Sequence, residues 1–145
     1  MRMQPIDVLL VEDNPADARL TMEALADCKM KLTVHTVHDG EEALDFLRKK
    51  HRFRSARLPD LILLDLHLPK KNGREVLAEI KDDPKLTVIP VVVLTSSKSE
   101  EDIMRSYQLH ANCFVTKPLG LEEFQRVVAE IETFWFTIVK LPDPA

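Results

Sequence analysis

Five stretches of this sequence are apolar and rich in β-branched residues. They cover Ile6–Val11, Leu32–Val37, Leu61–Leu64, Val88–Leu94 and Cys113–Val115. The first, third and fourth are almost continuously apolar, and a strand of that kind must be covered on both of its faces, as in a parallel sheet. The pattern therefore predicts a buried parallel sheet of five strands.

Helical patterns alternate with these stretches. The first four are preceded by capping residues at Asn14-Pro15, Asp39-Gly40, Asn72-Gly73 and Ser99. Their expected inward-facing residues are Leu20, Ala24, Leu25 and Cys28, then Ala43, Leu44 and Leu47, then Val76, Leu77 and Ile80, and finally Ile103 and Tyr107. A fifth helix is expected from about Leu121 to Val139. This (βα)5 order predicts an α/β fold with a doubly wound sheet and an extended C-terminal helix.

Size and composition suit one globular domain. The 145 residues are expected to form a single domain, with a core over about residues 5–132 and an extension over about 133–145. The net charge of -4 argues against a nucleic-acid partner, and no apolar run approaches the roughly 20 residues that cross a bilayer, which argues against a membrane partner. Two cysteines, Cys28 and Cys113, make no disulfide framework, which favours a cytoplasmic protein.

Carboxylates end two of the apolar stretches. Glu12 and Asp13 follow the first stretch, and Asp65 follows the third. Sites in open parallel sheets form beyond the carboxyl ends of the strands, so these three side chains are expected to converge if the strands are neighbours. Three close carboxylates repel one another, and their oxygen ligands favour Mg²⁺. His67 is expected at the rim of the site rather than on the metal, because Mg²⁺ prefers oxygen.

Two further stretches end in residues that suit phosphate chemistry. Thr95 follows the fourth stretch, and Lys117 follows the fifth. Carboxylate, metal, ammonium and hydroxyl together describe a phosphoryl-transfer site. Asp65 is the expected nucleophile, which would form an acyl phosphate while Mg²⁺ and Lys117 neutralise the transferred oxygens.

These residues resemble the receiver domain of bacterial two-component response regulators. The matching motifs are Glu12-Asp13, Asp65 followed by LHLP, Asn72-Gly73, Thr95-Ser96 and Lys117-Pro118, and the resemblance covers nearly the whole chain. A closer resemblance is to the small receivers that pair with bacterial phytochrome kinases. It is carried by KKNGREVLAEIK, IPVVVLTSS and the ending FWFTIVKLP.

The resemblance implies a flavodoxin-like sheet of order 2-1-3-4-5. It implies a stand-alone receiver in a phosphorelay, with Asp65 phosphorylated by a sensor histidine kinase and with a phytochrome as that kinase. Mg²⁺ would bind Asp13, Asp65 and the backbone carbonyl of His67, with Glu12 acting mainly through a water. The positions that bind the phosphoryl group or couple it to a surface change would be Thr95, Ser96, Phe114 and Lys117. The bond between Lys117 and Pro118 is expected to be cis.

Two other functions remain open at this point. A metal-dependent aspartyl-phosphate hydrolase usually needs a carboxylate two residues after its nucleophile, where this chain has His67. A constitutive binding module would not need Asp65 or Lys117, and both are present. The protein is therefore expected not to be an enzyme beyond Mg²⁺-dependent self-phosphorylation and self-dephosphorylation. Its output is expected to come from binding a phosphotransfer or target protein.

Two surface features suggest contacts with other molecules. The segment RKKHRFRSAR (48–57) is basic, and either a solvated loop or a partner contact fits it better than nucleic-acid binding. Phe134, Trp135 and Phe136 are consecutive, and neighbours on a helix point about 100° apart, so one core cannot bury all three. They are expected to form a homodimer interface with the fourth helix and fifth strand. Folding back on their own domain and docking the kinase are the alternatives.

Overall fold

The computed structural model describes residues 6–27, 31–96, 99 and 113–137, and for residues 130–137 it describes the backbone only. Its five strands are β1 (Ile6–Val11), β2 (Leu32–Val37), β3 (Leu61–Asp65), β4 (Val91–Thr95) and β5 (Cys113–Thr116). All neighbouring pairs are parallel, and the order in the sheet is β2-β1-β3-β4-β5. The flavodoxin-like order 2-1-3-4-5 is therefore confirmed.

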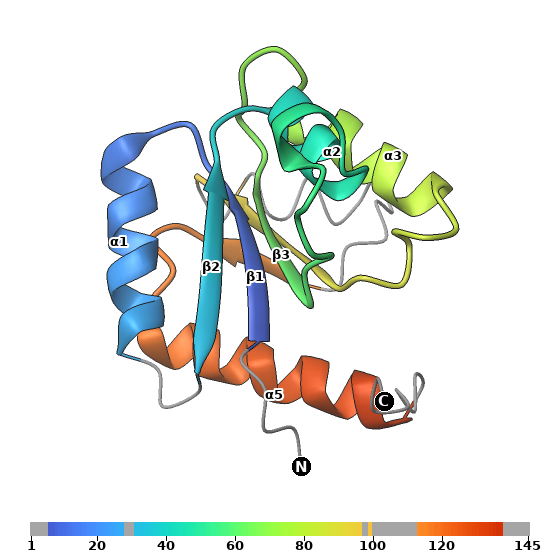
Figure 1. Cartoon of the computed structure of the whole chain (residues 1–145). Helices are drawn as coiled ribbons and strands as arrows, with labels where there is room; N and C mark the ends of the chain where they lie inside the picture. The colour runs from blue at the N-terminus through green and yellow to red at the C-terminus, as the bar shows by residue number, and fades with distance from the viewer. Residues whose placement is uncertain (1–5, 28–30, 97–98, 100–112, 138–145) are drawn as a thin grey trace.

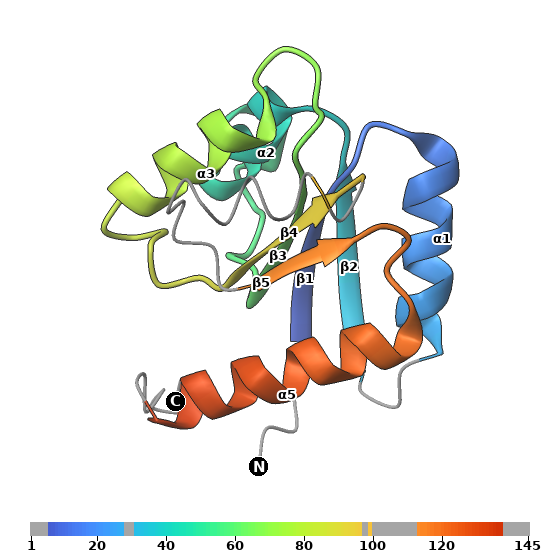
Figure 2. The ribbon, with the colours of Figure 1, turned by 180° about the vertical axis from the view of Figure 1, so that it is seen from behind.

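Helices cover both faces of this sheet. They are α1 (Pro15–Ala26), α2 (Gly40–Leu47), the short 3-10 helix η1 (His51–Phe53), α3 (Gly73–Asp82) and α5 (Leu121–Thr137). Figures 1 and 2 show α1 and α5 on one side of the sheet and α2 and α3 on the other. Along β1, Val8 and Leu10 pack in the core with α1 and α5, whereas Leu9 and Val11 pack in the core with α2 and α3. Both faces of the strand are buried, which explains its continuous apolar sequence.

The first three helices begin where the predicted caps lie. The side chain of Asn14 accepts hydrogen bonds from the amides of Ala16 and Asp17, at 2.9 and 3.1 Å. Asp39 accepts from the amide of Glu42 at 2.8 Å. Asn72 starts α3 with a reciprocal capping box to Glu75, which the sequence Asn-Gly-Arg-Glu allows. These helix starts all follow the carboxyl ends of β1, β2 and β3, so they anchor the loops that carry the polar residues there.

The fourth strand starts later than its sequence suggests. The apolar run from Val88 predicts a strand there, but β4 begins at Val91 and Val88 is 57% exposed. The amides of Leu86 and Thr87 donate to the carbonyl of Asp83, so this segment forms helical turns after α3. Pro90 then separates the turns from the strand and has no N–H to offer the sheet.

The buried face of α1 also differs from the prediction. Leu20 is 49% exposed, so its assignment to the inward-facing stripe is wrong. The buried residues are Thr21 and Leu25, with Ala18 packed partly against the same core. Leu25 is therefore buried as predicted, Ala24 is half-buried, and Thr21 takes the inward-facing place that was assigned to Leu20. Cys28, which was assigned to the same stripe, lies outside the described residues.

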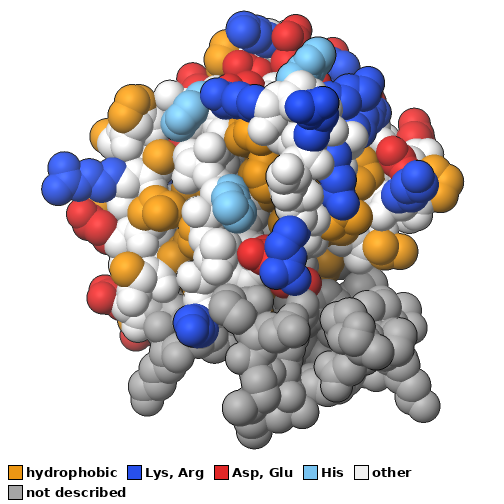
Figure 3. Space-filling model, viewed as in Figure 1, with side chains coloured by type: hydrophobic (Ala, Val, Ile, Leu, Met, Phe, Trp, Pro, Cys, Tyr) orange, Lys and Arg blue, Asp and Glu red, His pale blue; other side chains and the backbone are white. Residues whose placement is uncertain are grey.

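The basic loop is tied to neighbouring helices. Arg48 donates to Glu79 of α3 at 3.1 Å, Lys71 also pairs with Glu79, and Arg52 pairs with Glu42 of α2. The hydrogen bond from Lys71 lowers the pKa of Glu79 despite slight burial. Figure 3 shows Lys and Arg side chains gathered over α2 and its adjoining loops, with acidic side chains among them. Part of the positive charge of residues 48–57 is thus neutralised within the domain.

The last helix is long compared with the strand before it. The 17 residues of α5 give a length of about 26 Å, whereas the four residues of β5 span about 13 Å. The α5 ribbon extends past the strands in both views (Figures 1 and 2). The side chains of Phe134, Trp135 and Phe136, and all but Ser99 of the expected fourth helix, lie outside the described residues. Among the helices that are described, none is long and apolar enough to cross a membrane.

Candidate functional site

The register of the sheet brings the three acidic residues together. Val11 pairs with Leu64, so the residues that follow them, Glu12 and Asp65, lie side by side at the carboxyl edge of the sheet. Ligand oxygens of Glu12, Asp13 and Asp65 all lie within 4.8 Å of one another. Glu12 and Asp65 are buried, whereas Asp13 is exposed. The site is therefore open to solvent on the Asp13 side.

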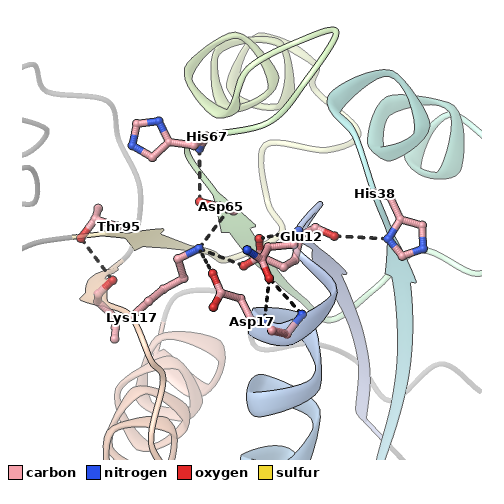
Figure 4. Close-up of polar contacts among 10 residues, drawn as sticks. Glu12, Asp17, His38, Asp65, His67, Thr95 and Lys117 are labelled. Atoms are coloured by element: carbon pink, nitrogen blue, oxygen red, sulfur yellow. Dashed lines mark hydrogen bonds and ion pairs between the residues drawn. The ribbon is translucent and has the colours of Figure 1, made fainter.

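The side chain of Lys117, which directly follows the edge strand β5, also reaches this cluster. Thr95 pairs with Thr116, and the amide of Lys117 donates to the carbonyl of Thr95 at 2.7 Å. The Lys117 ammonium lies 3.3 Å from Asp65 Oδ2 and 3.2 Å from Glu12 Oε1. Figure 4 shows the side chain extended across the sheet edge toward these carboxylates. The peptide bond from Lys117 to Pro118 is cis.

One residue of the cluster was not predicted from the sequence. Asp17, in the first turn of α1, places its Oδ2 2.9 Å from the Lys117 ammonium, closer than either of the other carboxylates. Asp17 lies in a helix, whereas the acidic residues that were predicted for the site all follow strands. The sequence did contain one indication of its role, because Asp17 is an acidic residue four positions after Asp13 in the helix that starts beside the site.

Burial and crowding shift the ionisation of two groups. Burial disfavours the charged form of Glu12 and, with a hydrogen bond and charge repulsion from Asp65, raises its pKa from 4.5 to about 7. The Lys117 charge and the amide of Asn14 offset only part of this rise. Burial lowers the pKa of Lys117, but its hydrogen bond to Asp17 and the charges of Asp65 and Glu12 outweigh burial and hold that pKa above its ordinary range.

The backbone behind Asp65 holds its carboxylate in place. The amide of His67 donates to Asp65 Oδ1 at 3.2 Å, and the amide of Gly73 donates to the carbonyl of Leu66 at 3.0 Å. A Cβ on Gly73 would lie 2.5 Å from the carbonyl oxygen of Asp65, so α3 can approach this closely only with glycine there. The His67 imidazole is exposed and points away from the carboxylates (Figure 4), so it offers no acid or base to them.

The remaining predicted residues lie at the end of β4 and on β5. Thr95 is fully buried, and its hydroxyl donates to the carbonyl of Val115 at 3.5 Å. Ser96 is exposed beside it. Phe114 is half-buried and packs against the core on the α2 and α3 side. The structure thus places Thr95 at the end of β4 next to Lys117, and Phe114 three residues before Lys117 on β5.

The donor set of the acidic cluster fits a hard divalent cation. The three side chains offer only carboxylate oxygens, and exposed Asp13 leaves room for metal-bound waters. The Lys117 ammonium already balances part of the negative charge, so the cluster need not be fully neutralised by metal.

Comparisons with known proteins indicate the family of this chain. The family model for the response regulator receiver domain matches residues 8–129. The response regulator Rcp1 of Synechocystis sp. (strain PCC 6803) is 48% identical over 138 residues, covering 95% of this chain and 94% of Rcp1. The crystal structure of its Mn²⁺-bound form has a TM-score of 0.74 and covers 95% of this chain and 99% of that one.

Two phytochrome response regulators of known structure are similarly close. The phosphorylated cyanobacterial phytochrome response regulator RcpA is 52% identical, with a TM-score of 0.75 over 98% of this chain and 100% of RcpA. The bacteriophytochrome response regulator AtBRR is 43% identical, with a TM-score of 0.84 over 91% of this chain and 96% of AtBRR. With a family model matching most of its length and relatives of this identity, the chain belongs to the response regulator receiver domains of two-component signalling.

Proposed function

We propose that this receiver accepts a phosphoryl group on Asp65 from the phosphohistidine of a sensor histidine kinase, and that the kinase is a phytochrome. The observation that carries the proposal is the buried Asp65 carboxylate, which has the Lys117 ammonium 3.3 Å from Oδ2 and two further carboxylates beside it. The similarity to RcpA and AtBRR supports a phytochrome as the partner.

In the proposed reaction, a carboxylate oxygen of Asp65 attacks the phosphorus of the phosphohistidine. The P–O bond forms as the P–N bond breaks, and the imidazole leaves with the electron pair and takes up a proton. Lys117 stabilises the negative charge on the transferred oxygens. Mg²⁺, held by Asp13, Asp65 and the carbonyl of His67, with Glu12 acting through a water, would neutralise the same oxygens.

Thr95 is proposed to carry the signal away from Asp65. Its hydroxyl would leave the carbonyl of Val115 and donate to a phosphoryl oxygen, with Ser96 lining the same end of the strand. Because the Thr95 carbonyl accepts from the amide of Lys117, a shift of β4 would also move the start of the segment that leads to α5. Phe114 on neighbouring β5 would repack in response.

The proposed output is a contact with another protein. In this proposal residues 1–145 form one domain, and the protein is cytoplasmic because the kinase must reach Asp65 there. The partner is a phosphotransfer or target protein. A homodimer through α5 is part of the proposal, because the helix is about twice as long as β5 and carries Phe134, Trp135 and Phe136 toward its end.

The test is phosphorylation in the presence of Mg²⁺. Acetyl phosphate should add one phosphoryl group, detected by intact mass and lost at alkaline pH as an acyl phosphate is. Asp65→Asn should abolish the addition, whereas Asp82→Asn, a change at an exposed aspartate at the end of α3, should not. Phosphorylation of the Asp65→Asn variant on a serine or histidine would refute the assignment. Transfer from a phytochrome kinase, but not from unrelated sensor kinases of the same genome, would identify the partner.

A further inference from the structure

The Lys117 ammonium has no spare hydrogen for a new acceptor. An ammonium has three N–H donors, and Lys117 lies within hydrogen-bond distance of three carboxylates. The distances are 2.9 Å to Asp17, 3.2 Å to Glu12 and 3.3 Å to Asp65. The shortest of the three therefore goes to a residue that is neither the phosphoryl acceptor nor one of the residues assigned to the metal.

Asp17 is held where it can keep this contact. The cap residue Asn14 accepts a hydrogen bond from the Asp17 amide, which fixes the first turn of α1. The Asp17 side chain is 36% exposed, compared with 0% for Glu12 and 2% for Asp65. Partial exposure to water lowers the cost of keeping the Asp17 side chain charged. Its ion pair with Lys117 is a direct contact between α1 and the loop after β5 (Figure 4).

We propose that Asp17 is a positioning residue that holds the Lys117 ammonium and competes with the phosphoryl group for it. The inference rests on the proposed phosphorylation of Asp65. In the unphosphorylated protein the ammonium is shared between α1 and the acidic cluster. The phosphoryl group needs the same ammonium, so Asp17 shifts the balance toward the unphosphorylated receiver.

The charge of the site supports this direction. Phosphorylation replaces the single negative charge of Asp65 with about two on the phosphoryl oxygens. Asp17 adds another negative charge on the ammonium side, where the phosphoryl group requires a positive one. Asparagine at this position keeps the shape of the side chain and removes the charge, so it should release Lys117 to the phosphoryl oxygens.

The experiment compares Asp17→Asn with wild type in two measurements. The first is the affinity for beryllofluoride, a phosphoryl mimic, in the presence of Mg²⁺, followed by amide chemical shifts. The second is the lifetime of the phosphorylated protein after acetyl phosphate is removed, followed by intact mass. Asp17→Asn should bind beryllofluoride more tightly and keep its phosphoryl group longer, each by about twofold to fivefold, within the range of solvent-exposed ion pairs.

Controls separate competition from loss of a negative charge or of helix stability. Glu23→Gln removes a charge from an exposed position of the same helix, where the side chain pairs with Arg19, and should match wild type. Asp17→Glu should return both values toward wild type. In a Lys117→Ala background, Asp17→Asn should have little further effect, because no ammonium remains to compete for.

The possible results distinguish the competition by Asp17 from the proposed phosphorylation of Asp65. If wild type accepts neither beryllofluoride nor a phosphoryl group, the proposed function fails. If wild type accepts both and Asp17→Asn is unchanged or weaker, the competition fails while the function stands. An equal gain from Asp17→Asn in the Lys117→Ala background would also overturn the inference, because it would show a general effect of charge.

Discussion

At the scale of single residues, the site depends on the buried carboxyl group of Glu12, whose pKa is close to neutral pH. Glu12 is fully buried, and Asp65 and Lys117 face it. Its pKa in the folded protein is about 7, compared with 4.5 ordinarily. Because its pKa is higher in the folded protein than in the unfolded one, Glu12 binds its proton more tightly in the folded state, and this stabilises the metal-free fold at low pH. The stabilisation is complete below about pH 4.5 and is lost as pH rises through about 7. A bound cation favours the ionised form and should reverse this loss.

The affinity for Mg²⁺ should therefore rise with pH. Between about pH 6 and about pH 8, Glu12 passes from mostly protonated to mostly ionised, and the dissociation constant should fall by up to roughly tenfold. Calorimetric titration of Mg²⁺ at the two pH values measures this. Glu12→Gln, which cannot ionise, is the control and should flatten the dependence. Equal affinities at both pH values in wild type would contradict the role of Glu12.

The acidic residues of the site were predictable because each follows an apolar strand. Glu12, Asp13 and Asp65 could be placed at one sheet edge from strand order alone, and the structure brings them within 4.8 Å. Asp17 was not predictable in this way, because its role depends on how far Lys117 reaches toward α1. The raised pKa of Glu12 likewise depends on burial, which no sequence pattern specifies.

At the scale of secondary structure elements, α3 approaches β3 so closely that one methyl group should disturb the site. A Cβ on Gly73 would lie 2.5 Å from the Asp65 carbonyl oxygen and 2.6 Å from Leu66 Cα. Gly73→Ala should lower the free energy of unfolding by about 1–3 kcal/mol. Urea denaturation measures the loss. Gly120→Ala is the matched control, because in the described part of the chain no atom beyond its own sequence neighbours lies within 4 Å of its Cβ position. A Gly73→Ala protein as stable as the control would show that the contact relaxes freely.

The orientation of α1 provides a second test at this scale. Leu25 is 3% exposed and packs in the core with α5, whereas Leu20 is 49% exposed. Leu25→Ala should destabilise the protein by about 2–4 kcal/mol, because it leaves a cavity. Leu20→Ala removes the same atoms from the surface of the same helix and should change stability by less than about 0.5 kcal/mol. Thermal unfolding of the two variants measures the difference, and similar losses would show that the helix face is misassigned.

Element positions were predictable where the apolar pattern had one interpretation. The strands β1 and β2 have the predicted bounds, and caps such as Asn14 start the helices expected. The start of β4 could not be predicted, because turns after α3 carry apolar residues such as Val88 at the surface. The face of α1 was predicted in part: Leu25 faces the core as expected, but Thr21 is buried where Leu20 was expected, and only the packing against the core decides between these two neighbours.

At the scale of the whole molecule, the site and the α5 side of the domain are joined through two short backbone links. The Thr95 carbonyl accepts from the Lys117 amide, and the Leu94 carbonyl accepts from the Leu66 amide next to Asp65. A change at Asp65 can therefore reach β4 and then the segment that leads into α5. The acidic cluster lies at the carboxyl edge of the sheet, and α5, the longest of the described helices, lies across the opposite part of the fold (Figure 2).

The whole-molecule prediction is that the receiver forms a homodimer through the end of α5, and that phosphorylation tightens it. Burying one large apolar side chain contributes about 1.5–3 kcal/mol, so a symmetric pair of helices carrying Phe134, Trp135 and Phe136 can hold a dimer. Sedimentation velocity, with and without beryllofluoride and Mg²⁺, should show a dimer that strengthens with the phosphoryl mimic. Trp135→Ala and Phe136→Ala should each weaken the dimer by tenfold or so.

Val88→Ala provides the control for this prediction, because it shortens an exposed apolar side chain that precedes β4 and is not part of α5, and it should leave association unchanged. The alternatives make different predictions for the same variants. If the aromatic residues fold back on their own domain, the substitutions should lower the unfolding temperature without changing the sedimentation coefficient. If they dock the kinase, the substitutions should slow phosphoryl transfer from the kinase but not from acetyl phosphate. A wild type that stays monomeric at high micromolar concentration in both states would exclude the dimer, and the two alternatives would then account for the length of α5.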